Sequence, residues 1–138
     1  MKKFIYLLMV LFAVNGALMA QVAVVANKSV KVDKLELSEV DNIFSQKVLK
    51  WTDGQKIVLI DQSADSEAKT KFYNVLGKEQ SALKKIWLRK QLTGEASAPQ
   101  NAGSDSEVIS KVSSTPGAIG YVSESSVNDN VKVVLIIK

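Results

Sequence analysis

Two short stretches combine serine with acidic residues where a helix would begin: "DQSADSEA" at residues 61–68 and "GSDSEV" at residues 103–108. The first turn of a helix carries backbone N–H groups without intrahelical partners, and the helix dipole places partial positive charge there. Such a turn can bind an anion, and neighbouring serine hydroxyls can add hydrogen bonds. The same serines are also favoured as helix caps. These residue types therefore fit both a binding role and a structural role.

The acidic residues of the first stretch suggest a second kind of chemistry. Asp61, Asp65 and Glu67 could form an acid pair or a site for a divalent cation. However, the chain has no histidine and no cysteine, which removes the usual general base, thiol nucleophile and zinc ligands. The other carboxylates are scattered singly, and no catalytic motif with the needed spacing occurs. We therefore expect no enzymatic activity, no cofactor and no bound metal.

The first twenty residues, "MKKFIYLLMVLFAVNGALMA", have the layout of a secretory signal peptide: two lysines, an apolar run and then small residues. The apolar run from Phe4 to Val14 is too short for a comfortable membrane span, which needs about 20 residues. We expect cleavage after Ala20, with Leu18 at the −3 position. The alternative is an uncleaved N-terminal anchor. The predicted location of the protein is the periplasm.

Removal of residues 1–20 leaves one domain of 118 residues, 21–138, which is large enough to bury a core without disulfides. It also takes Lys2 and Lys3 from a chain of net charge +4, which leaves +2. This mild charge, without alternating basic and aromatic residues, gives no indication of nucleic-acid binding. It is compatible with a locally positive anion site.

Apolar patterning predicts the elements that must position the two serine-rich turns. Strands are expected at the apolar, largely β-branched runs 22–30, 56–60, 118–122 and 131–138. Helices are expected where apolar residues recur at i, i+3 and i+4 spacing, at residues 38–44, 66–77, 81–94 and 104–114. The small, polar residues 94–104 are expected to form a loop. Continuous apolar strands mixed with helices predict an α/β fold with helices on both faces of the sheet.

Several other residues are expected to have structural roles. Ser38 is the predicted N-cap of the first helix. Trp51 and Trp87 are expected to pack in the core rather than to form a ligand platform. The lysines and arginine between residues 84 and 90 are expected on a solvated helix face. Gly120, inside the predicted strand 118–122, is expected where another part of the backbone approaches closely.

A series of motifs occurs in order along the chain: "VVANKSV", "LSEVDNIF", "WTDGQKIVLI", Phe72 and "SEVISKVSSTPGAIGYV". The most specific pieces are "IF" followed by W-x-D-G, and V-x-x-T-P-G-A-I-G-Y-V at residues 112–122. In this order and spacing they resemble the second lobe of phosphate-type periplasmic substrate-binding proteins of ABC transporters. The resemblance covers residues 22–137. It implies a single lobe of a periplasmic-binding-protein-like fold, with a mixed sheet flanked by helices.

Members of this family hold a small oxyanion in a cleft between two lobes, using backbone amides at helix starts and serine or threonine hydroxyls. The resemblance therefore implies that the ligand-binding residues of this chain are Ser63, Ser66, Ser104 and Ser106. The alternative for each of these serines is a helix cap without ligand contact.

The chain departs from the family pattern at the first turn. The family commonly has an arginine there, followed a few residues later by Ser-Gly-Thr. Those last three positions fall on Ser66, Glu67 and Ala68, and Asp61 stands where the arginine is expected. Two carboxylates would then repel an anion, and Lys69 and Lys71 offset this only at the strength of surface ion pairs, about 0.2–1 kcal/mol each.

Two functions are consistent with these features. The first is an exported solute-binding-like protein that holds phosphate or another small oxyanion for an ABC transporter. A single lobe leaves such a site open to water, so a homodimer or a partner such as the transporter permease would close it. The second is an envelope protein-interaction module that has lost its ligand and contacts another protein through the former inter-lobe face.

Overall fold

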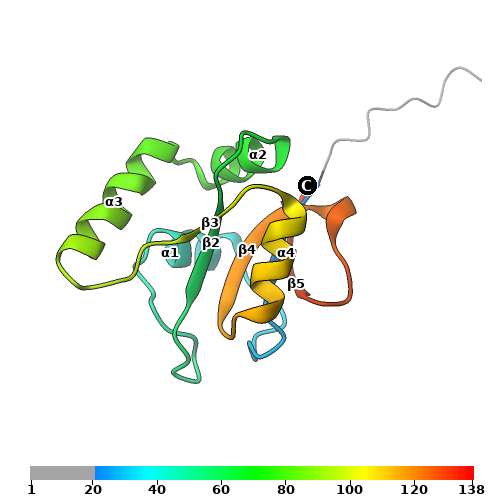
Figure 1. The fold of residues 1–138 in the computed structure, drawn as a ribbon, viewed down its shortest axis with the longest axis horizontal. Coiled ribbons are helices and arrows are strands. Elements are labelled where there is room, and N and C mark those ends of the chain that lie inside the picture. Colours follow the sequence, from blue (N-terminus) through cyan, green and yellow to red (C-terminus); the bar gives the residue numbers. More distant parts are fainter. Residues whose placement is uncertain (1–20) are drawn as a thin grey trace, which may run out of the picture.

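The computed structural model of the chain describes residues 21–138. The predicted signal peptide, its cleavage after Ala20 and the alternative anchor lie outside the described residues. The described part contains, in order, β1 (Val22–Ala26), α1 (Leu37–Phe44), β2 (Val58–Gln62), α2 (Glu67–Leu76), α3 (Gln80–Leu92), β3 (Gln100–Ala102), α4 (Asp105–Ser114), β4 (Ala118–Ser123) and β5 (Lys132–Ile137) (Figure 1). Within residues 21–138, no helix is long and apolar enough to cross a membrane.

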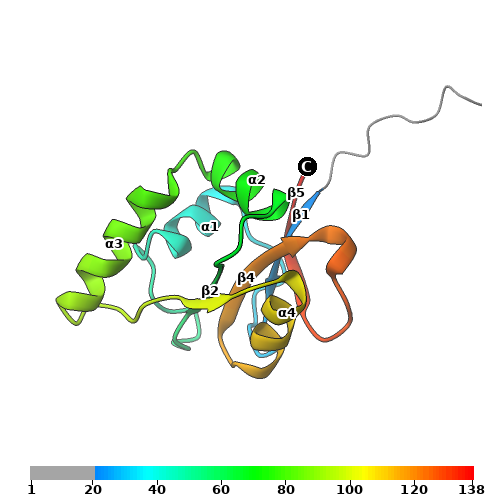
Figure 2. The same ribbon diagram turned by 45° about the horizontal axis from the view of Figure 1, so that its top comes forward.

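The strands form one mixed sheet in the order β3-β2-β4-β1-β5. β2 is parallel to both β3 and β4, whereas β1 is antiparallel to both β4 and β5. The N-terminal strand therefore lies inside the sheet, between two strands from the end of the chain (Figure 2). The predicted α/β fold with a mixed sheet is confirmed.

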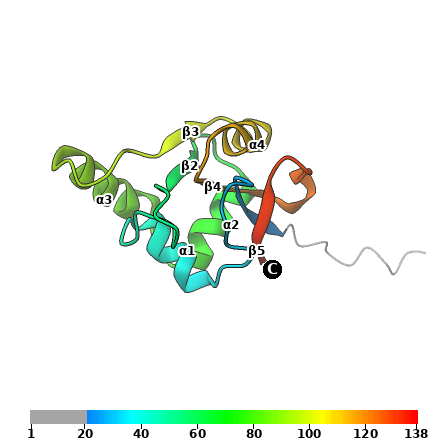
Figure 3. The ribbon, with the colours of Figure 1, turned by 90° about the horizontal axis from the view of Figure 1, so that it is seen from below.

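Both faces of the sheet are covered, and this explains the unbroken apolar strands. Val22, Val24 and Ala26 of β1 face a core shared with α1, α2 and α3, whereas Ala23 and Val25 face a second core shared with α4. Figure 3 shows α4 on one side of the sheet and α1 and α2 on the other. All five residues of β1 are consequently buried.

The segment predicted as a loop, residues 94–104, contains the edge strand β3. Its three residues pair in parallel with the end of β2, with Ile60 opposite Gln100 and Gln62 opposite Ala102. Gln100 and Asn101 are polar and exposed, so no apolar alternation marked this strand in the sequence. Its position depends on pairing with β2 rather than on its own propensity.

Two predicted boundaries are also wrong. The N-cap of the first helix is Glu36, whose amide donates to Glu39 Oε1 (3.1 Å), and Ser38 lies inside the helix. Strand β2 continues beyond Ile60 to include Asp61 and Gln62, which lie outside the strand predicted at residues 56–60. Both side chains are buried, so they lie within the packed structure.

Trp51 and Gly117 of the sequence motifs contact each other where β4 begins, beside the segment that leads into β2. Gly117 has φ of +78°, and a side chain there would collide with the carbonyl oxygen of Lys56. The indole of Trp51 is buried and donates a hydrogen bond to the Gly117 carbonyl oxygen (2.9 Å). A Cβ on Gly120 would lie 2.9 Å from Cγ1 of Val108 in α4, so the close neighbour of this glycine is a side chain and not the backbone that was predicted.

Candidate functional site

Two helices begin at the edge of the sheet where parallel strands end. α2 follows β2 after the connection 63–66, and α4 follows β3 after Gly103 and Ser104. Both starts lie at the upper edge in Figure 1. α2 packs on one face of the sheet and α4 on the other. In open α/β sheets, ligands bind outside the carboxyl ends of the strands at such a change of face.

Ser66 is the N-cap of α2. Its Oγ accepts a hydrogen bond from the Lys69 amide (3.0 Å) and donates one to Oε1 of Gln62 (3.0 Å). The hydroxyl proton is therefore already used within the protein. Ser66 can still accept a bond, but it can donate to an anion only by releasing Gln62.

Gln62, which sequence reasoning did not single out, connects the two helix starts. Its side chain is only 1% exposed. Its amide nitrogen donates to Asp105 Oδ1 (2.8 Å) and to the Tyr121 carbonyl oxygen (2.9 Å), while its oxygen accepts from Ser66. The only sequence signal was its place two residues beyond the apolar run that ends at Ile60, where a buried strand can continue.

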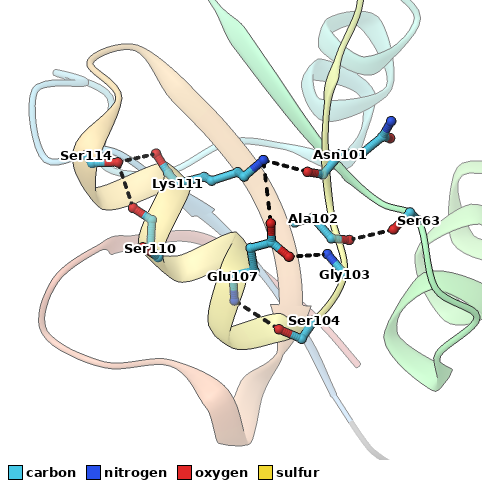
Figure 4. A network of polar contacts seen from close by, with 9 residues as sticks. All are labelled: Ser63, Asn101, Ala102, Gly103, Ser104, Glu107, Ser110, Lys111 and Ser114. Atoms are coloured by element: carbon cyan, nitrogen blue, oxygen red, sulfur yellow. Dashed lines mark hydrogen bonds and ion pairs between the residues drawn. The ribbon is translucent and has the colours of Figure 1, made fainter.

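The start of α4 is filled by the side chains of its own first turn. Ser104 caps the helix by accepting from the Glu107 amide (3.1 Å), and Glu107 Oε2 accepts from the Gly103 amide (2.6 Å). Lys111 lies beside Glu107, with 3.7 Å between Nζ and Oε1. Figure 4 shows the Glu107 carboxylate placed between Lys111 and Gly103.

Asp105 adds a second carboxylate at this start. Besides the bond from Gln62, its Oδ2 accepts from the Ser123 amide (3.1 Å) and from the Ser126 hydroxyl (2.8 Å). Asp105 thereby joins the start of α4 to the end of β4 and to the short 3₁₀ turn that follows. Both first-turn carboxylates of α4 are thus engaged within the protein.

The other two candidate serines lie apart from this arrangement. Ser63 is exposed, and its Oγ donates to the Ala102 carbonyl oxygen (3.3 Å), which joins the ends of β2 and β3 (Figure 4). Ser106 is exposed on α4 and lines a separate polar groove of about 510 Å³ together with Ser110, Ser113 and Asn128. The four predicted serines therefore do not converge on one point.

Asp61 points away from the edge and into the core on the α2 face. Its side chain is 2% exposed, and Oδ1 accepts hydrogen bonds from the hydroxyls of Tyr121 (2.6 Å) and Tyr73 (3.0 Å). Burial raises the pKa of both tyrosines well above the usual value, and the negative charge of Asp61 raises it further. The expectation that Asp61 would lie in a polar loop beside a bound anion is therefore wrong.

The carboxylates considered for an acid pair are also separated by burial. Asp61 is enclosed and bonded to two tyrosines, whereas Asp65 and Glu67 are exposed. Within residues 21–138, no group of three or more His, Cys, Asp or Glu residues is placed to hold a metal ion.

The two helix starts share one feature and differ in another. The first two amides of each helix have no hydrogen-bond acceptor among residues 21–138. An anion at α4 would face the engaged carboxylates of Asp105 and Glu107. An anion at α2 would face Asp65 and Glu67, which are both exposed, so that water screens their charges. The start of α2 is therefore the better candidate for an anion.

Comparison with known proteins supports the same fold. A phosphate ABC transporter substrate-binding protein from Clostridium perfringens with bound phosphate has a TM-score of 0.69 and 23% identity; the match covers 83% of this chain and 45% of that chain. A phosphate transport receptor from Vibrio cholerae has a TM-score of 0.66 and 22% identity, and covers 83% of this chain and 46% of that one. This chain thus spans less than half the length of these proteins.

The model of the family described as the PBP superfamily domain matches residues 12–134. This range includes every described strand and helix except the last residues of β5. The chain therefore belongs to the PBP superfamily domain family.

Proposed function

We propose that this protein is an exported, solute-binding-like protein that holds a small oxyanion, such as phosphate, at the start of α2. The observation that carries the proposal is the pair of unpartnered amides at Glu67 and Ala68, beside the Ser66 cap and at the carboxyl end of β2. The likeness in fold to phosphate-binding proteins supports an anion as the ligand.

The physical basis is the polarity of the helix start. Two amide donors and the positive end of the helix dipole favour an anion there. Each hydrogen bond exchanged with water contributes about 0.5–1.5 kcal/mol, which places the dissociation constant of an open half-site in the millimolar range or weaker. Lys69 and Lys71 follow Glu67 in the same helix and add positive charge to it.

A second protein surface that covers the anion at the start of α2 would increase the affinity by excluding water. In this proposal that surface comes from another molecule, either a second copy of the chain or an envelope protein such as an ABC transporter permease. Transport in the periplasm, with delivery of the anion to that permease, is the corresponding role.

The test is an NMR titration with phosphate, sulfate and chloride at constant ionic strength, using two matched serine variants. Both Ser66→Ala and Ser104→Ala remove a cap and should lower the free energy of unfolding by about 1 kcal/mol. Only Ser66→Ala should weaken phosphate binding, by about fivefold for a change of about 1 kcal/mol. Absence of any shift near α2 up to saturating phosphate would end the proposal, and equal loss in both variants would contradict the choice of α2.

The second candidate function is a protein-interaction module without a ligand. The exposed Asp65 and Glu67, together with Ala68 in place of a hydroxyl residue, favour this function because they weaken an anion site. Light scattering and cross-linking in periplasmic extract test it. A protein that binds no oxyanion but forms a defined complex would support this function, and a strictly monomeric protein without partner would contradict it.

A further inference from the structure

A groove of about 720 Å³ lies at the other end of β2, away from the start of α2. One wall is the segment 56–59, which leads into β2, and the other is the connection from α3 to β3, residues 94–100. Ile43 of α1 and Leu49 form apolar parts of the lining. In Figure 1 the connection runs from α3 at the left to β3, past α1.

Gln46 lines this groove in an unusual conformation. It follows the last turn of α1 with φ of +57°, a left-handed conformation that glycine adopts far more readily than glutamine. Such strain persists where the surroundings enforce it, and it is concentrated at functional sites. The turn itself imposes this conformation, because the amides of Gln46 and Lys47 donate to the carbonyl oxygens of Ile43 (3.0 Å) and Asn42 (2.9 Å), and it holds the Gln46 side chain at the groove.

The side chain of Gln46 also has an unused acceptor. The residue is 4% exposed, and its Nε2 donates to the Ser97 carbonyl oxygen (3.0 Å), which fixes the orientation of the amide. Its Oε1 is buried and accepts no hydrogen bond within residues 21–138. A buried acceptor without a partner is rare and unfavourable, and a ligand donor would satisfy it.

Two lysines add positive charge to the groove. Lys50 and Lys56 form an antiparallel bridge, so their side chains lie on the same side of neighbouring segments. Lys56 Nζ donates to the Ser97 hydroxyl (3.1 Å). Glu95 is the only carboxylate among the described lining residues. It forms an ion pair with Lys90, with 3.9 Å between Glu95 Oε2 and Lys90 Nζ. Like charges side by side repel, and a bound anion would relieve this repulsion.

We propose that this groove is a second binding site, independent of the α2 site, for a small amphipathic acid. The ligand class has an apolar ring or chain against Ile43 and Leu49, one N–H or O–H donor for Gln46 Oε1, and a carboxylate for Lys50 and Lys56. Because Oε1 is covered in the structure, the connection around Ser97 shifts slightly when the donor enters.

Indole-3-acetate is a suitable probe, because it combines an apolar ring, one N–H donor and a carboxylate. In a ¹H–¹⁵N NMR titration it should shift the amides of residues 94–100 and 56–59, while the start of α2 stays unchanged. The N-methyl derivative lacks only the donor and should bind about fivefold more weakly, as expected for one hydrogen bond. Equal binding of the two probes would contradict the role of Gln46.

Three variants complete the test. Gln46→Gly suits the left-handed backbone, so it should keep the fold but lose the preference for the N–H probe. Ala98→Trp should fill the groove and abolish binding, whereas Ala82→Trp, an exposed position on α3 outside the lining residues, should have no effect. If Ala98→Trp still binds the probe, or if the shifts map to the exposed Leu88 and Leu92 instead, the proposal is overturned.

Discussion

The starts of α2 and α4 have the same sequence character, yet each is held in place in a different way. α4 is held at its tip, where Asp105 and Glu107 accept bonds from the surrounding backbone and side chains. α2 is held on its buried side, where Asp61 accepts hydrogen bonds from Tyr73 of the helix and from Tyr121 of β4. Because this contact lies on the buried side of α2, it leaves the amides of Glu67 and Ala68 at the helix start without an acceptor within residues 21–138. The position of the carboxylate, rather than its presence, thus distinguishes the two helix starts.

High pH should test the anchor beneath α2, with the largest effect. The pKa values of Tyr73 and Tyr121 are raised in the folded protein, so their contribution to stability is complete below pH 10 and declines as the pH rises further. At pH 11 the two tyrosines together should lower the free energy of unfolding by about 3 kcal/mol, given a usual tyrosine pKa of about 10. Urea unfolding followed by circular dichroism between pH 9 and 11 measures this loss.

The matched control is Tyr121→Phe, which removes one of the two titrating groups. Its stability should fall about half as steeply above pH 10, because Tyr73 is then the one remaining tyrosine of the pair with a raised pKa. An unchanged slope in this variant would show that the buried tyrosines do not control alkaline stability.

Gln62→Leu should disturb both starts at once, with the next largest effect. The variant removes the hydrogen bonds that Gln62 makes with Asp105 Oδ1, the Ser66 hydroxyl and the Tyr121 carbonyl oxygen, and we expect a loss of about 2 kcal/mol in the free energy of unfolding. Gln91→Leu makes the same change at an exposed position of α3 and should stay within about 0.5 kcal/mol of the original protein. Comparable losses in both variants would mean that Gln62 does not link the two helices.

The smallest expected effect concerns the charge at each tip. Glu67→Gln removes the exposed carboxylate at α2 and should tighten phosphate binding by about two- to fivefold, the range for a surface charge interaction. Glu107→Gln, which keeps an acceptor for the Gly103 amide, should not change that affinity. NMR titration with phosphate distinguishes them, and an equal gain from Glu107→Gln would place the anion at α4 instead.

The sequence predicted the parts of the fold that apolar spacing encodes. β1, the buried faces of α1 and α4, and the positions of Trp51 and Trp87 are all confirmed, because burial selects apolar residues with the period of each element. β3 was not predicted, because Gln100 and Asn101 are polar and the strand forms only through its pairing with β2. Asp61 and Gln62 were left out of the predicted strand. A polar residue at the end of a strand can be exposed to water or buried with hydrogen-bond partners, and the sequence does not distinguish these two cases.

The candidate site was predictable only in outline. The serine-rich pattern correctly identified Ser66 and Ser104 as residues at helix starts, where both act as caps. It could not show that Gln62 joins the two starts, because that contact links residues 43 positions apart along the chain. The role of the four serines in ligand binding remains a prediction.

The interior position of β1 has a consequence for how the chain folds. Val22 pairs with both Ser123 and Ile137, so the first strand has no lasting neighbours until the last ones have been synthesised. Pairings between distant segments form slowly, since a long loop must close before they contribute stability. The sheet can therefore be completed only after the segment that forms β5 has been synthesised.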